Sequence, residues 1–179
     1  MSISVPTSIR QDFQDWRPQR GDIFYVDTQV NRGFLIHESG DFTSFPLATG
    51  QRRFVSYIGL YYNAATPVGT WTVKSIHTQG DRVTYGKRGT FLRLYRDGEE
   101  WSHYGIHEHL YGNEMLASDQ RYRSMGCIIV SREILDTLMA TYELNGEELQ
   151  VVTSYGLDDT LFAARDQEEE EHDVVASSV

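Results

Sequence analysis

A succession of short apolar runs separated by turn residues dominates the sequence between residues 22 and 109. The runs are rich in Val, Ile, Thr, Tyr and Phe, which favour strands. Tight-turn signals lie between them, such as Ser-Gly-Asp at 39–41 and Asp-Gly at 97–98. This spacing is typical of a sandwich or barrel rather than of alternating strands and helices. We therefore predict a mainly β fold, a compact β sandwich or barrel, with strands at 22–27, 33–38, 43–49, 53–59, 70–76, 90–95 and 101–109.

One helix is expected, over about 131–145. Ser131 is a favourable N-cap, and Asn145-Gly146 is a typical helix end. Between them, apolar residues recur at helical spacing: Ile134, Leu135, Leu138, Met139 and Tyr142. Strands are predicted on either side, at 127–130 after a long loop (110–126) and at 149–156.

The chain has the length of a single domain. We divide it into an N-terminal arm (1–20), a folded domain (21–160) and an acidic, disordered tail (161–179). The formal net charge is −10, and about half of the excess lies in the last fifteen residues. Nucleic acids and anionic membrane surfaces bind clustered Lys and Arg, so neither is an expected partner.

No run approaches the ~20 apolar residues of a membrane span. The first sixteen residues lack a basic segment followed by an apolar run, so no secretory signal peptide is expected in this chain. The only cysteine is Cys127, which excludes an internal disulfide. We expect a monomer without a metal or other cofactor.

The lone cysteine stands in the sequence Ser124-Met125-Gly126-Cys127-Ile128. Glycine before a reactive residue allows a sharp turn that directs N–H groups to one point, where they can stabilise an oxyanion. A neighbouring imidazole can activate the thiol. From position alone, the alternative that Cys127 is a small buried apolar residue is favoured by roughly two to one.

Three histidines, His103, His107 and His109, are separated by even numbers of positions. In an extended segment they would share one face of the strand. One of them could serve as the base for the cysteine, or the three could bind a metal. The alternative is that they are ordinary surface or hydrogen-bonded histidines, which is the better interpretation for His103.

Together, several segments resemble the L,D-transpeptidase (YkuD-like) catalytic domain. Residues 66–73, TPVGTWTV, are similar to the TPxGxFxI segment of the family, and Tyr104-Gly-Ile-His107 resembles the segment that carries its catalytic histidine. The sequence from Ser124 to Ile128 resembles the SHGC(I/V) nucleophile motif, and sixteen residues separate His107 from Ser124. Residues 23–50 resemble the first hairpin and the following strand. The resemblance covers about residues 22–155.

The resemblance implies a mainly β catalytic domain that acts on peptidoglycan stem peptides. Family members cleave the L,D-peptide bond after the third stem residue, hold the acyl group as a cysteine thioester, and pass it to an amine of another stem to form a 3→3 cross-link. Water as the acceptor gives L,D-carboxypeptidase activity instead. The implied location is the cell envelope, the periplasm or the extracellular space.

Carried over to this sequence, the resemblance implies Cys127 as the nucleophile and His107 as general base and acid. It further implies that the backbone carbonyl of Glu108 orients the imidazole and that the N–H groups of Gly126 and Cys127 hold the oxyanion. The expected substrate-binding residues are Ser124, Met125, Tyr104, Tyr122 and Arg123.

Two positions depart from the family pattern. Met125 stands where the family usually has His, and Ile129 stands where it usually has Arg. A cation near this position could bind a substrate carboxylate. Arg121, Arg123 and Arg132 are nearby candidates for that charge, although ordinary surface positions are the plainer interpretation of each.

Two alternatives remain open from the sequence. His107, His109 and Glu114 partly resemble the first motif of cupin metal proteins, but Trp101 and Arg121 stand where that motif has glycines, and no second motif follows. A catalytically weak or non-catalytic wall-binding relative would instead keep the fold without turnover, in keeping with Met125 and Ile129.

Overall fold

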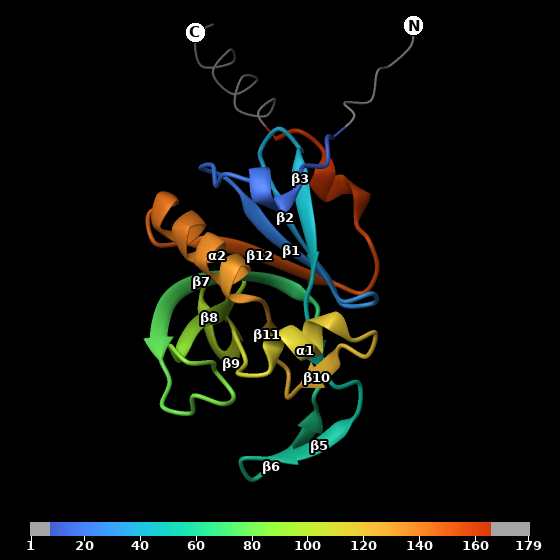
Figure 1. The fold of residues 1–179 in the computed structure, drawn as a ribbon, viewed down its shortest axis with the longest axis vertical. Coiled ribbons are helices and arrows are strands. Elements are labelled where there is room, and N and C mark those ends of the chain that lie inside the picture. Colours follow the sequence, from blue (N-terminus) through green and yellow to red (C-terminus); the bar gives the residue numbers. More distant parts are fainter. Residues whose placement is uncertain (1–7, 166–179) are drawn as a thin grey trace, which may run out of the picture.

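Eight strands form one strongly curled sheet in the order β11-β9-β8-β7-β12-β1-β2-β3 (Figure 1). The computed structural model describes residues 8–165. β1 pairs in parallel with β12, and β11 pairs in parallel with β9, whereas the other neighbours are antiparallel. The strands are β1 (Ile23–Asp27), β2 (Arg32–Ile36), β3 (Phe42–Pro46), β7 (Gly69–Thr78), β8 (Thr90–Arg96), β9 (Glu100–His107), β11 (Ile128–Ile129) and β12 (Leu149–Ser154). The predicted mainly β fold is confirmed.

Two small sheets complete the strand set. β4 (Thr49–Gly50) pairs in parallel with β10 (Tyr122–Ser124), and β5 (Phe54–Tyr57) forms a hairpin with β6 (Leu60–Asn63). The hairpin projects from the body at the end opposite β3 (Figure 1). Ile58 and Gly59 both have positive φ (50° and 72°), as a two-residue primed turn requires. The single strand predicted at 53–59 is therefore the first arm of a hairpin.

Helix α2 (Arg132–Leu144) packs its apolar side against the sheet, as predicted. Ser131 caps it by accepting a hydrogen bond from the Ile134 N–H at 3.3 Å. Ile134, Leu135 and Leu138 are buried in the core with residues from β1, β7, β8 and β9. Helical periodicity and the cap together determine this element.

The segment 110–126, expected to be a loop, contains α1 (Gly112–Ala117) as well as β10. This six-residue helix has no side-chain cap hydrogen bond. It therefore lacks the local signals by which a helix is recognised in a sequence.

The ends of the chain contribute to packing. Beside η1 (Phe13–Asp15), Trp16 is buried in the core and stacks on His37 with ring centroids 3.7 Å apart. At the end of η2 (Asp159–Phe162), the Phe162 ring packs against the Phe42 ring with centroids 4.9 Å apart. Most of the predicted acidic tail, residues 166–179, lies outside the described residues. Within residues 8–165, no helix is long and apolar enough to cross a membrane.

Candidate active site

Strand alternation divides the side chains of β8 and β9 between the core and an outer face. Leu92 and Ile106 pair in register and point into the core. Their neighbours therefore point outward. On that face Phe91 pairs with His107, and Arg93 pairs with Gly105.

The register of β11 brings Cys127 to the same face. Ile128 pairs with Ile106 and belongs to the core, so Cys127, one residue earlier, comes level with Gly105 and points outward. Cys127, just before β11, and His107, the last residue of β9, thus lie on the same sheet face, two residues apart along β9. The Cys127 Sγ itself lies 4.0 Å from the His103 carbonyl oxygen.

A hydrogen-bonded turn positions the cysteine. Ser124 Oγ donates to the Cys127 carbonyl at 2.5 Å and accepts from the Gly126 N–H at 3.1 Å. Thr66 Oγ1 donates to the Gly126 carbonyl at 2.8 Å. Gly126 has φ +127°, and a Cβ there would lie 2.6 Å from the Tyr104 ring. Only glycine fits this position without strain.

Replacing Gly126 with alanine is therefore expected to destabilise the fold by roughly 1–3 kcal/mol and to displace the thiol. Urea unfolding followed by circular dichroism measures the first effect. Gly80→Ala is the matched control, because Gly80 is exposed and a Cβ there meets nothing within 4 Å. Equal unfolding midpoints for the two variants would contradict the proposed constraint.

The thiol of Cys127 is partly buried and uncharged at neutral pH. Burial raises its pKa to about 11, although the Gly105 N–H and the charge of Arg93 oppose the shift. Burial also raises the pKa values of Tyr85 and Tyr104, and the nearby thiol raises both further. The phenol groups of Tyr85 and Tyr104 therefore lie near the sulfur.

His107 is a buried, neutral imidazole. Its Nδ1–H donates to the Glu108 carbonyl at 2.5 Å, which leaves Nε2 with the lone pair. Its ring packs against Tyr85 (centroids 4.8 Å apart) and Phe91 (6.0 Å). Burial lowers the pKa of His107 to about 4, while backbone hydrogen bonding to Glu108 and Thr84 acts in the opposite direction. The imidazole is therefore unprotonated at neutral pH, with Nε2 available as an acceptor.

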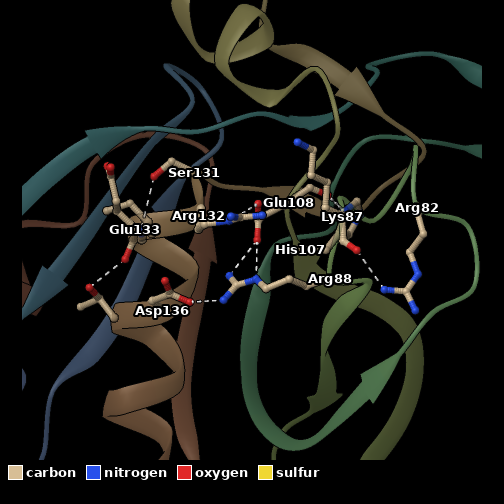
Figure 2. Close-up of polar contacts among 11 residues, drawn as sticks. Arg82, Lys87, Arg88, His107, Glu108, Ser131, Arg132, Glu133 and Asp136 are labelled. Carbon is tan, nitrogen blue, oxygen red and sulfur yellow. Dashed lines mark hydrogen bonds and ion pairs between the residues drawn. The ribbon is translucent and has the colours of Figure 1, made fainter.

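The side chain of Glu108 anchors the carbonyl that orients His107 (Figure 2). Arg88 donates to Glu108 Oε1 from Nη2 at 2.8 Å, and Arg132 Nε lies 3.4 Å from Oε2. Arg88 also pairs with Asp136 of α2 at 2.7 Å. The family resemblance implies a role for the Glu108 backbone alone and does not indicate Arg88, since no local pattern in the sequence links positions 20 residues apart.

A cavity of about 360 Å³ opens beside Glu108 and the start of α2. Lys87, Glu108, His109 and Arg132 are among its lining residues. Cys127 does not contribute to that lining, so the cavity and the thiol are separate features of this part of the molecule.

The residues expected to bind substrate occupy different surroundings. Ser124 is buried within the turn, whereas Met125 is exposed and its carbonyl accepts a hydrogen bond from Tyr62 at 2.8 Å. Tyr104 packs between the turn and Trp71. The Tyr122 hydroxyl is bonded to the Thr28 and Gln29 carbonyls, and Arg123 is exposed. Met125 is two residues before Cys127 in the chain, and Tyr104 is near enough for the thiol to raise its pKa.

The three residues of the metal alternative do not form a metal site. β9 ends at His107, so His109 lies beyond the strand and accepts a hydrogen bond from the Tyr111 N–H at 3.0 Å. Within residues 8–165, no three His, Cys, Asp or Glu side chains are grouped to hold a metal ion. The shared strand face predicted for the three histidines is therefore wrong for His109.

Comparison with known proteins relates this arrangement to one family. The family model described as the L,D-transpeptidase catalytic domain, YkuD, matches residues 21–151. No curated protein sequence matches the chain.

Three solved structures share the fold. They are an L,D-transpeptidase from Xylanimonas cellulosilytica DSM 15894 (17% identity, TM-score 0.53, covering 78% of this chain and 63% of that one), Bd1075 from Bdellovibrio bacteriovorus (14%, 0.52, 87% and 56%), and a cysteine-to-serine mutant of an Enterococcus faecium L,D-transpeptidase (16%, 0.52, 76% and 50%). This chain thus spans 50–63% of their lengths.

Proposed function

Because the chain belongs to the L,D-transpeptidase catalytic domain family, we propose that it is a cysteine acyltransferase acting on peptidoglycan stem peptides in the cell envelope. The observation that supports this proposal is the strand register, which puts the cysteine of the chain on the same sheet face as a neutral, oriented imidazole two residues further along β9. Family membership supports a cysteine-dependent acyltransferase; the residue roles and the reaction products that follow are our proposal.

In the first half-reaction, Cys127 attacks the carbonyl carbon of the L,D-peptide bond after the third stem residue. The S–H proton passes to His107 Nε2 as the C–S bond forms. The C–N bond then breaks, and the imidazolium returns the proton to the departing D-alanine amine. The products are a Cys127 thioester and free D-alanine.

In the second half-reaction, an amine of another stem attacks the thioester. His107 removes a proton from that amine, the C–S bond breaks, and the thiolate of Cys127 recovers a proton from the imidazolium. The product is a 3→3 cross-link. Water in place of the amine gives a carboxylic acid, which is L,D-carboxypeptidase activity.

The resting protonation states support attack assisted by a general base rather than by a preformed thiolate. A thiol with a pKa of about 11 and an imidazole with a pKa of about 4 are both neutral at pH 7. Proton transfer therefore accompanies the attack on the substrate. The Glu108 carbonyl accepts from Nδ1–H throughout, which stabilises the transient imidazolium.

The turn already engages the N–H of one of the two expected oxyanion donors, Gly126 and Cys127. The Gly126 N–H is engaged by Ser124 Oγ, so we assign the oxyanion to the Cys127 N–H and give Gly126 the task of shaping the turn. A single preorganised backbone donor can stabilise the negative charge of the transition state substantially.

Intact-mass spectrometry after incubation with a carbapenem tests the proposal. The expected result is one covalent adduct per chain, mapped by proteolysis to Cys127. Incubation with a stem tetrapeptide should also release D-alanine. A folded protein that binds stem peptides yet forms no adduct and releases no D-alanine would favour the non-catalytic wall-binding alternative.

A further inference from the structure

Arg93 lies in the same row of the sheet as the thiol. It pairs with Gly105 across β8 and β9, and Cys127 comes level with Gly105 on the other side. Gly105 has no side chain, and a Cβ there would lie 2.2 Å from the Phe91 ring. Gly105 therefore adds no side chain between Arg93 and Cys127, and the Phe91 ring lies over it instead.

The guanidinium of Arg93 is held in place by neutral partners. Nη1 donates to the Ser102 carbonyl at 2.7 Å, and Nε faces His77 Nε2 at 3.4 Å. The Trp101 and Phe91 rings lie 4.4 and 5.0 Å from its central carbon. These contacts fix the plane of the guanidinium but leave other N–H donors for a ligand.

The charge of Arg93 is not neutralised by a carboxylate. None of the ion pairs found in residues 8–165 includes it. Its charge nevertheless acts on the thiol, because it lowers the pKa of Cys127 against the effect of burial. Arg93 is thus a preorganised cation close to the reacting sulfur.

Two of the three arginines considered from the sequence have other partners, whereas Arg123 is exposed. Arg121 donates to the carbonyls of Leu47, Ser118, Val30 and Asn31, and Arg132 contacts Glu108. Ile129 is 2% exposed, with its N–H bonded to the Ala48 carbonyl at 2.8 Å. Position 129 is therefore part of the packed edge of the sheet rather than of an open surface.

We propose that Arg93 binds a carboxylate of the acyl donor beside Cys127 and thereby selects and aligns the donor. This inference rests on the proposed transpeptidase function. A fixed guanidinium suits a carboxylate because two parallel N–H groups can contact both oxygens. Two carboxylates of the donor have this chemistry: the terminal α-carboxylate of D-alanine, and the side-chain carboxylate of a third-residue diaminopimelate.

Donor amidation distinguishes these sources. Three tetrapeptide stems are compared by D-alanine or D-alaninamide release: the unmodified stem, a stem with a C-terminal amide, and a stem amidated on the diaminopimelate carboxylate. For the wild type, amidating the recognised carboxylate is expected to lower kcat/KM by about 10- to 100-fold, whereas amidating the other has little effect.

The variant Arg93→Gln should lose the same factor on the unmodified stem and show no further loss on the amidated one. Arg93→Lys should recover part of the preference, since it keeps the charge without the fork of donors. Arg96→Gln is the matched control: Arg96 lies on the same strand, 4.4 Å from the Trp71 ring, and should keep the full preference.

Two outcomes overturn the inference. The first is a wild-type protein that turns over all three donors equally well; this result alone refutes carboxylate recognition. The second is an equal loss of kcat/KM for Arg93→Gln on every donor, together with a matching loss in the rate of alkylation by uncharged iodoacetamide. Arg93 would then act only on the reactivity of the thiol. A wild type that forms no thioester with any donor or carbapenem would refute the proposed function itself, and this result is distinct from lost selectivity.

Discussion

Replacing Cys127 with alanine is expected to lower acyl transfer by at least about 1,000-fold. No other thiol exists in the chain, so the thioester cannot form elsewhere. The side chain is small and only partly buried, and its removal leaves the Ser124–Gly126 turn with all its hydrogen bonds. We therefore expect the loss of activity without loss of the fold.

D-alanine release and intact mass after carbapenem treatment measure this effect, and circular dichroism checks the fold. Cys127→Ser is the companion variant, because it preserves size while replacing the sulfur with a hydroxyl that is a much weaker nucleophile. Turnover retained by a folded Cys127→Ala protein would reject the mechanism. Ser102→Ala, a substitution in β9, serves as a control. If it lowered activity as much as Cys127→Ala does, the loss would reflect disruption of β9 rather than removal of the thiol.

Replacing His107 is expected to lower kcat/KM by about 100- to 10,000-fold, whereas His109→Ala should have an effect below about fivefold. His107 supplies the lone pair at Nε2, but His109 lies beyond the strand with its Nδ1 engaged by a backbone N–H. His107→Gln is the preferred variant because it fills most of the space between Tyr85 and Phe91. Equal losses for the two histidines would contradict the assignment and revive a shared metal.

The pH profile of the wild type follows from the same imidazole. The pKa of His107 is lowered to about 4, so the base stays competent as pH falls below 6.5, where a free histidine would be protonated, and is lost only near pH 4. Because the folded pKa lies below the unfolded one, the native state also loses stability over this range. Rates must therefore be read where circular dichroism reports a folded protein. A decline in kcat/KM centred near pH 6.5 would show that His107 is not desolvated.

The strands and the main helix were predictable because their signals are local. The β-favouring composition of β7, β8 and β9 and the Ser131 cap of α2 are properties of a few consecutive residues. α1 and β10 escaped prediction for the opposite reason. One lacks a cap, and the other is a three-residue strand whose partner, β4, is more than 70 residues away in the chain.

The candidate site was predictable in its chemistry but not in its surroundings. The sequence motif predicts Cys127 and His107 as the reacting pair, and strand alternation alone does not reveal their neighbours. Arg93 and Tyr85 reach the site through pairing across strands or through ring packing, which one sequence does not specify. The same limit applies to the Gly126 N–H, whose engagement by Ser124 depends on the shape of the turn.

β11 contains only two residues and forms one border of the large sheet. The alignment of sulfur and imidazole depends on its register with β9, supported on the other side by the bridge between Ile129 and Ala48. Opening this short border would break few hydrogen bonds compared with melting the whole domain. Mild heat or denaturant should thus inactivate the protein reversibly while its spectroscopic signature is still native.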